Sequence, residues 1–461
     1  MKKSIPVSIF LSLSLAAVLF SSCKPKSVKT DSESDSGTVT VTVAGPWGEF
    51  PALETAAAAF TKKYPDCKIE YEYIQNYGQS LITRLKNADS GIDIFVTNNI
   101  LPGSPLQPYT LELFSQGSRL DLSHTFDGLI QNFTYKETPQ SPQQLYAIPM
   151  GAELRGMYVN KTLLAKLGIS IPQNRSEFLA ACEKLLKAGY IPVQGNPSKT
   201  GQWLLYPYIC GRIVDNKEYH EWYSNINSCK SECSEYFRDA MQFMYLLVEK
   251  GYYNYKYVET TYKTFSTTQQ DALARYFLNI QSNNSIYTKC DDTGIIAFMP
   301  GTMSLGNILA KAKDDYHSLI EYTFILSPVT DRGGYAYMSP ADGLAINKKA
   351  EHTEQALQFL NFLFTPETNK KFASQQNITP DTADAFDQIK KQFSIPANRI
   401  LHVGQVTFDY NFFSVISETL IDISKANNPK YMLQNKDGTY TMYPFETYMH
   451  RLAERFAKVK K

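Results

Sequence analysis

Residues 38–47 read TVTVTVAGPW, and this stretch decides the fold class more clearly than any other. Valine and threonine alternate through residues 38–44, which predicts a strand, and a Gly-Pro pair ends it. Apolar residues recur every three to four positions over residues 51–64, which predicts a helix. A strand, a helix and another strand follow within residues 69–96. Three strands joined by helices predict a parallel sheet in an α/β domain.

A second unit of mixed structure is expected after residue 150. Asn174 and Glu177 have the spacing of a helix capping box, and Gly189 closes the helix that they open. Further along the chain the pattern predicts a helix near residues 234–250, a strand at residues 294–299 and a helix near residues 353–364. The whole chain is therefore expected to be α/β.

Length and composition limit the classes of protein that fit. The chain has 461 residues, which predicts two or three domains. Hydrophobic residues make up 43% and charged residues 20%, so a large core is expected and a mostly disordered chain is excluded. The formal net charge is +1, which does not indicate nucleic acid as a partner.

An N-terminal segment of the secretory type precedes the body. Residues 5–20 form an apolar stretch that is too short for a membrane span, which needs about 20 apolar residues. The following LFSSC segment resembles a bacterial lipobox, although Phe20 holds the place where leucine is usual. We expect residues 1–22 to be removed as a signal peptide and Cys23 to be lipidated. Residues 23–37 then form a flexible tether, and the protein is extracytoplasmic and anchored to a bacterial membrane.

Six other cysteines allow disulfides outside the cytoplasm, and the spacing leaves bridges and buried thiols equally open. They are Cys67, Cys182, Cys210, Cys229, Cys233 and Cys290. Cys229 and Cys233 are a candidate pair. The cysteine spacing fits no zinc pattern and the six histidines are scattered, so no metal site is predicted.

The common catalytic motifs are missing from the sequence. It contains no G-x-S-x-G elbow. Gly195 and Gly201 have the spacing of a phosphate-binding loop, but the Lys-Ser/Thr pair that such a loop requires does not follow. We therefore predict a protein that is not an enzyme, with no catalytic residue and no cofactor.

Several segments resemble the family 1 extracellular solute-binding proteins, the ligand-capturing component of ABC importers. In the order of the family, these are residues 38–99, LYAIPMGAELRGMYVNKTLLAKLG from residue 145, TGIIAFMPGTMSLGN from residue 293 and PADGLAINKKAEHTEQALQFLNFLF from residue 340. The resemblance implies a two-lobed, type II periplasmic-binding-protein-like fold with hinge crossovers and a ligand cleft between the lobes. It places lobe one at 38–151 plus 339–385, and lobe two at 152–338 plus 386–461.

The resemblance also implies a function. The protein would be a monomer that captures a small polar solute, best predicted to be a mono- or oligosaccharide, and delivers it to permease subunits of an ABC transporter. Two alternatives stay open: a binding protein for a polar solute other than sugar, and the ligand-binding component of a membrane sensory system.

Candidate ligand residues in lobe one follow predicted strands, because α/β sheets bind ligands at the carboxyl ends of their strands. Trp47 follows the first strand and offers a ring that can stack on a sugar. Glu49 can accept hydroxyl hydrogen bonds, or it can stabilise the start of the next helix. Asn98 and Asn99 end the third strand, where they are either ligands or turn residues.

Candidates in the first crossover and in lobe two carry comparable alternatives. Glu153 and Arg155 either face the cleft or form a solvated hinge pair. Trp203 either stacks on the ligand or packs its helix. Trp222 is predicted to be a core residue.

The remaining candidates follow a later strand or flank the second crossover. Gly301 and Ser304 would offer backbone N–H donors at the start of a helix. Sugar-binding members usually carry tryptophan near this point, and its replacement by G-T-M-S-L favours the alternative of another polar solute. Tyr335 and Asp342 flank the second crossover, where Asp342 can bind hydroxyls or a cationic group.

Overall fold

The computed structural model describes most of the chain beyond the first 36 residues. The described residues are 37–48, 50–87, 90–97, 100, 104–123, 130, 133–136, 140–196, 199–217, 221, 231–255, 276–280, 295–340, 342–365, 367–368, 389–402 and 410–458. The protein is α/β and two-lobed, as the sequence predicted, and each lobe has a sheet and a hydrophobic core of its own. No helix in this part of the chain has the length and apolar character that crossing a membrane requires.

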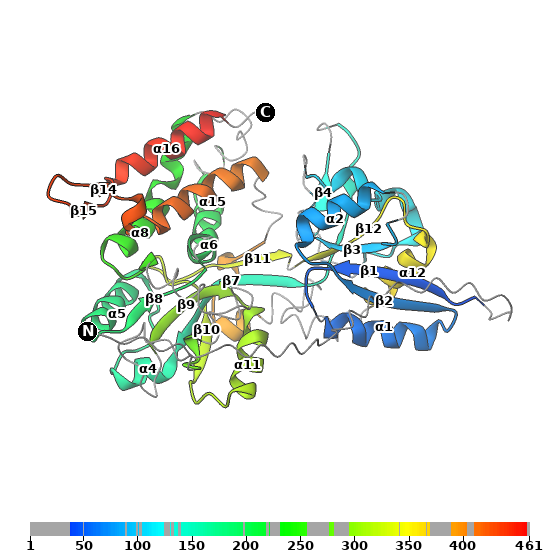
Figure 1. Ribbon diagram of the computed structural model, residues 1–461, viewed down its shortest axis with the longest axis horizontal. Coiled ribbons are helices and arrows are strands. Elements are labelled where there is room, and N and C mark those ends of the chain that lie inside the picture. The colour runs from blue at the N-terminus through cyan, green and yellow to red at the C-terminus, as the bar shows by residue number, and fades with distance from the viewer. Residues whose placement is uncertain are drawn as a thin grey trace, which may run out of the picture. The chain divides into compact units, whose positions relative to one another are not determined.

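The first sheet has five strands in the order β2-β1-β3-β12-β6 (Figure 1). Their bounds are Cys67–Tyr73, Val39–Gly45, Ile94–Thr97, Gly343–Ile346 and Ile148–Pro149. β1 pairs in parallel with β2 and β3, which confirms the parallel sheet predicted from the alternating valines. β12 is antiparallel to both β3 and β6, so segments far apart in the sequence complete this sheet.

Among the described residues, the helices that belong to the first sheet are α1 (Pro51–Lys63), α2 (Tyr77–Lys86) and α12 (Thr353–Leu363). Proline is tolerated in the first turn of α1 because the N–H groups of that turn have no hydrogen-bond partner within the helix, so the N–H that proline lacks is not needed. The ring centroid of Phe60 in α1 lies 5.1 Å from that of Phe359 in α12, and both side chains are fully buried. α1 and α12 therefore share one face of the sheet, and α2 lies across the sheet from α1 (Figure 1).

The second sheet has six strands, with the order β13-β11-β7-β9-β8 and β10 paired to β7. Their bounds are Ile400–His402, Ala336–Pro340, Ala152–Asn160, Ile296–Thr302, Ile191–Val193 and Tyr322–Ile325. β7 is antiparallel to β9, β10 and β11, whereas β8 and β9 are parallel. β9 extends three residues beyond the predicted strand end.

The second lobe includes the helices α4 (Lys161–Lys166), α5 (Arg175–Lys187), α6 (Thr200–Asp215), α8 (Arg238–Glu249), α11 (Leu305–Asp315), α15 (Tyr410–Ser424) and α16 (Phe445–Lys458). Asn174 caps α5 through its side chain and Gly189 has a positive φ, which confirms the predicted helix boundaries. The helix predicted near residues 234–250 is divided into a 3-10 helix, Ser231–Phe237, and α8.

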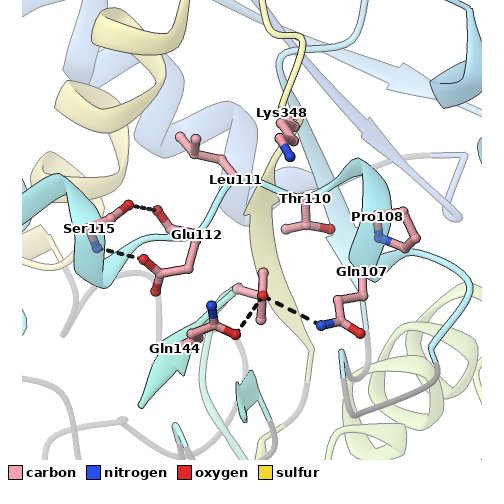
Figure 2. A pocket seen from close by; sticks show the side chains of 9 residues that line it. Gln107, Pro108, Thr110, Leu111, Glu112, Ser115, Gln144 and Lys348 are labelled. Carbon is pink, nitrogen blue, oxygen red and sulfur yellow. Dashed lines mark hydrogen bonds between the residues drawn. The ribbon is translucent and has the colours of Figure 1, made fainter. Parts of the chain in front are cut away.

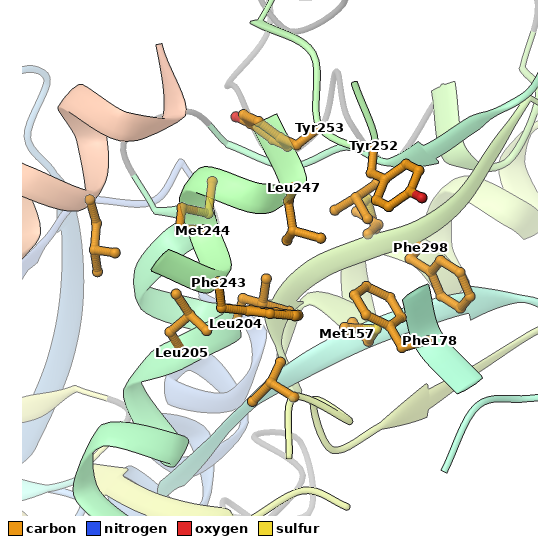
Figure 3. Close-up of a cluster of buried hydrophobic side chains, with 14 of the residues drawn as sticks. Met157, Phe178, Leu204, Leu205, Phe243, Met244, Leu247, Tyr252, Tyr253 and Phe298 are labelled. Carbon is orange, nitrogen blue, oxygen red and sulfur yellow. The ribbon is translucent and has the colours of Figure 1, made fainter. Parts of the chain in front are cut away.

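The core of the second lobe lies where α5, α6 and α8 meet the sheet (Figure 3). Phe178 of α5 and Phe298 of β9 pack edge to face with ring centroids 5.1 Å apart. Leu204 and Leu205 of α6 and Leu247 of α8 are fully buried in the same cluster. Two small antiparallel pairs lie outside the main sheets: β4 (Thr134–Tyr135) with β5 (Gln144–Leu145), and β14 (Leu433–Gln434) with β15 (Tyr440–Thr441).

Among the described residues, two crossovers join the sheets and run beside each other. β6 continues into β7 through residues 150–151, and β11 continues into β12 through residues 341–342. Ser339 pairs with Glu153, and the Met150 N–H donates to the Asp342 carbonyl at 2.7 Å. The two crossovers are thus hydrogen-bonded to one another.

The cysteines divide into two groups. Cys67, Cys182 and Cys210 are free and buried. Cys233 is disulfide-bonded, and its partner lies outside the described residues, as do Cys229 and Cys290.

Candidate functional site

Trp47 lies beyond the carboxyl end of β1, where the sequence places it. Its side chain is half-buried and meets Phe50 edge to face, with ring centroids 4.9 Å apart. The Tyr71 hydroxyl accepts a hydrogen bond from the Trp47 N–H at 3.1 Å and donates one to the Trp47 carbonyl at 2.7 Å. Trp47 is therefore held in place and still exposes part of its ring. Glu49, Asn98 and Asn99 lie outside the described residues, as does Trp222.

The Tyr77 side chain lies at the carboxyl ends of two neighbouring strands, β1 and β3. Its hydroxyl donates to the Val96 carbonyl of β3 at 2.7 Å and lies 3.0 Å from the Ala44 carbonyl of β1. Burial is the main cause that raises the pKa of Tyr77, and the nearby Asp342 carboxylate raises it further. Asp342 in the second crossover therefore lies near this edge of the first sheet.

Glu153 and Ser304 come together although 151 positions separate them in the sequence. The Ser304 N–H donates to one carboxylate oxygen of Glu153 at 2.9 Å, and the Ser304 hydroxyl donates to the other at 2.6 Å. Ser304 is the residue that precedes α11, and Glu153 takes the N–H that was expected to face a ligand. The first crossover is thereby fixed to the start of α11.

Burial shapes the acidity of Glu153, which is only 9% exposed. Desolvation raises its pKa to about 7, whereas the two hydrogen bonds from Ser304 and the charge of Arg155 act in the opposite direction. The pKa of Asp342 is also raised, to about 8, mainly by desolvation and further by the charge of Glu153. The crossovers thus bring two carboxyl groups together that titrate near neutral pH.

Arg155 lies on β7 beneath α6. Its guanidinium carbon is 4.7 Å from the ring centroid of Tyr206 in α6 and 5.9 Å from that of Tyr337 in β11. The side chain is half-buried, and its Nη1 atom is buried without a hydrogen-bond partner among the described residues. The charge of Arg155 is thus stabilised by cation–π contacts with two aromatic rings. No carboxylate of the described residues forms an ion pair with it.

Lys199 and Trp203 lie at the start of α6. Lys199 is exposed, and its pKa is lowered, first by desolvation and then by the charge of Arg155. Trp203 is 7% exposed, so its ring is mostly covered in this structure. Lys199 was not among the residues singled out from the sequence.

Gly301 lies inside β9 rather than at the start of a helix. It pairs with Gly156 of β7, and a Cβ atom at this position would come within 2.9 Å of Leu305. Tyr335 is tied to α6, since its hydroxyl donates to Asp215 at 2.6 Å. Burial and the Asp215 carboxylate raise the pKa of Tyr335 to about 12.

A separate pocket of about 510 Å³ opens in the first lobe (Figure 2). It is lined by Gln107, Pro108, Thr110, Leu111, Glu112, Ser115, Gln144, Tyr146 and Lys348. Glu112 accepts hydrogen bonds from the N–H groups of Phe114, Ser115 and Leu145, so its carboxylate stabilises the surrounding loops. None of the residues singled out from the sequence lines this pocket.

The structure therefore places four of the residues predicted from the sequence near one another: Glu153, Ser304, Arg155 and Asp342. Lys199, Tyr206 and Tyr77, which were not predicted, lie beside members of this group. Asp342 offers a carboxyl group, Arg155 offers a guanidinium backed by the rings of Tyr206 and Tyr337, and Lys199 offers an exposed ammonium, which suits the binding of a polar solute. Within the described part of the chain, no three histidine, cysteine or acidic side chains are arranged to hold a metal ion.

Comparison with known proteins decides the family. Residues 44–370 match the family model of bacterial extracellular solute-binding proteins. The chain belongs to this family. Extracellular solute-binding proteins are binding proteins and not enzymes, and they function outside the cytoplasm. No curated protein matches the chain significantly in sequence.

Solved structures of solute-binding proteins share the fold at low sequence identity. A sugar transporter of Bacillus licheniformis in complex with stachyose is 15% identical with a TM-score of 0.59, over 92% of this chain and 100% of that one. The maltose-bound MalE3 of T. maritima is also 15% identical, with a TM-score of 0.59 over 91% and 99% of the two chains. A sugar transporter of Rhizobium etli, solved in an open conformation, is 18% identical with a TM-score of 0.57, over 92% of this chain and 100% of that one.

Proposed function

We propose that this solute-binding protein captures a carbohydrate outside the cytoplasm and delivers it to the permease subunits of an ABC transporter. The ligand would lie between the lobes, at the carboxyl ends of their strands. The observation that carries the proposal is the cluster of Glu153, Ser304, Arg155 and Asp342 at the crossovers. A ligand that touches this cluster would touch the segments about which two lobes can rotate.

Aromatic and polar side chains at the crossovers support a sugar as the ligand. Trp47 exposes part of a ring that can stack on the apolar face of a sugar. Asp342 is half-buried and, when protonated, can both donate to and accept from hydroxyl groups. The solved structures with stachyose and maltose belong to proteins of the same fold and support this class of ligand.

A thermal-shift screen of the purified protein against a library of mono- and oligosaccharides tests the proposal. A ligand at about 100 times its dissociation constant stabilises the folded state by about 2.7 kcal/mol, which is a clear rise in melting temperature. We expect at least one carbohydrate to give such a rise. Stabilisation by amines or peptides with none by any sugar would contradict the carbohydrate assignment.

Attachment to the membrane through lipid on Cys23 is part of the same proposal. Because residues 24–37 are polar, we expect Cys23 to be the residue on which membrane retention depends. Cells that express the wild-type protein or the Cys23→Ala variant are labelled with a fatty acid. We expect label in the wild type alone, and label in the variant would overturn the anchor.

A further inference from the structure

The loop between β1 and α1 carries Trp47 and has few local features that would hold it in one conformation. It begins Gly45-Pro46-Trp47-Gly48. Pro46 has no N–H and so cannot donate to a neighbouring strand. Gly48 is exposed, and a Cβ atom there would have no neighbour within 4 Å. Whatever fixes Trp47 must therefore come from elsewhere in the chain.

The Tyr71 hydroxyl, on the neighbouring strand β2, fixes the backbone of Trp47. It accepts a hydrogen bond from the Trp47 N–H at 3.1 Å and donates one to the Trp47 carbonyl at 2.7 Å. A phenolic O–H can donate and accept at once, so this single group satisfies both backbone groups of Trp47. The buried ring of Phe50 meets the rings of Trp47 and Tyr71 edge to face, with centroid distances of 4.9 Å and 5.6 Å.

Gly45 allows Tyr71 to reach the loop. A Cβ atom at position 45 would lie 2.5 Å from the Tyr71 hydroxyl oxygen and 2.6 Å from an atom of its ring. Glycine in a strand often marks such a close approach, although it lowers the stability of the strand itself. Any larger residue at position 45 would displace the hydroxyl that holds Trp47.

From these contacts we infer that Tyr71 is a positioning residue for sugar binding, which acts by holding the Trp47 ring in the orientation that stacks on the ligand. The inference rests on the proposed function, because it concerns the stacking surface of the same site. A ring that is already fixed loses less conformational freedom when a sugar arrives. A mobile Trp47 would therefore bind the same sugar more weakly, although no side chain that contacts the sugar had been removed.

The Tyr71→Phe variant tests the inference on the full-length protein in detergent, because it removes the hydroxyl and keeps the ring against Phe50. The probes are maltose, raffinose and stachyose, and calorimetry measures their dissociation constants. We expect binding to weaken about three- to tenfold, which is less than in Trp47→Ala, because the indole is misplaced and not removed. Tyr245→Phe is the matched control: it removes a hydroxyl of α8 that donates to the Tyr443 carbonyl at 3.0 Å, and it should leave affinity unchanged.

A double-mutant cycle shows whether Tyr71 acts through Trp47. We expect Tyr71→Phe to weaken binding in the wild-type background and to have no further effect in the Trp47→Ala background. Fluorescence adds a measurement without sugar. The emission of Trp47, taken as the difference from Trp47→Ala, should be quenched more readily by acrylamide in Tyr71→Phe than in the wild type or in Tyr245→Phe.

Two different failures can be told apart. Wild-type affinity in Tyr71→Phe, or an equal loss of affinity with and without Trp47, would overturn the positioning role and leave the carbohydrate function standing. If the wild-type protein binds none of the three probes and no other sugar, the carbohydrate function is overturned and the inference falls with it.

Discussion

Ser304 satisfies both carboxylate oxygens of Glu153, one through its N–H at 2.9 Å and the other through its hydroxyl at 2.6 Å. This contact joins the first crossover to the start of α11 and buries an acidic side chain beside Arg155 and Asp342. Hydrogen bonds to a buried carboxylate favour its charged form, whereas desolvation disfavours it, and here desolvation is the larger effect.

The Glu153→Gln variant should change how stability depends on pH. The folded protein holds a proton on Glu153 up to about pH 7, whereas the unfolded chain releases it near pH 4.5. The folded state therefore binds more protons between these values, and this group makes the free energy of unfolding fall as pH rises through that window. The total is on the order of 3 kcal/mol at most. The variant should lack this fall, which denaturant unfolding between pH 4.5 and 8 would measure.

Two controls make the Glu153 result specific. Glu351→Gln removes an exposed carboxylate and should keep the wild-type pH dependence. Asp342→Asn should flatten the same curve up to about pH 8, because its pKa is raised in the same direction. An unchanged curve for Glu153→Gln would mean that Glu153 is ionised throughout this range in the folded protein.

Gly156 is a position where close packing, and not a positive φ, requires glycine. A Cβ atom there would lie 2.3 Å from the Ile325 carbonyl oxygen, on a neighbouring strand. Gly156→Ala should therefore destabilise the protein by at least about 2 kcal/mol. Gly78→Ala is the matched control: it lies within α2 with open space around it and should stabilise the protein by about 0.5–1 kcal/mol. Equal melting temperatures for the two variants would contradict this packing.

Local patterns predicted the strands and helices well because their causes are local. The alternation in residues 38–44 and the apolar face of α1 depend on neighbours in the sequence, and both appear where expected. Gly156 and Gly343 each lie in a strand against a close neighbour, which only the assembled sheets define.

The candidate site was less accessible to sequence reasoning because it is made by contacts between distant segments. The bond between Glu153 and Ser304 depends on β9 lying next to β7. Lys199 lies in the Gly195–Gly201 segment that was set aside as a failed phosphate loop. Its relation to Arg155 depends on α6 packing over β7, which neither residue's neighbours in the sequence reveal.

Two tryptophans should respond differently to truncation. Trp47 is half-exposed at the carboxyl end of β1, so Trp47→Ala should weaken sugar binding by about 1–3 kcal/mol, a range taken from stacking of bases on aromatic side chains. Trp203 is 7% exposed, so Trp203→Ala should lower the free energy of unfolding by about 3–5 kcal/mol. Calorimetry and thermal melts on both variants measure the two effects. Wild-type affinity in Trp47→Ala would remove Trp47 from the ligand site.

Ligand binding should close the two lobes by rotation about the crossovers. The crossovers are hydrogen-bonded to one another between Met150 and Asp342, so they should bend as a unit while the sheets on either side stay intact. A ligand that contacts Asp342 from one lobe and Arg155 or Lys199 from the other would bind the closed form more tightly, which is the condition for a ligand to shift the equilibrium. Small-angle scattering with and without a saturating sugar measures the change, and we expect a smaller radius of gyration with sugar. An unchanged radius at saturation would indicate a rigid receptor, and would leave the permease without a ligand-dependent shape to recognise.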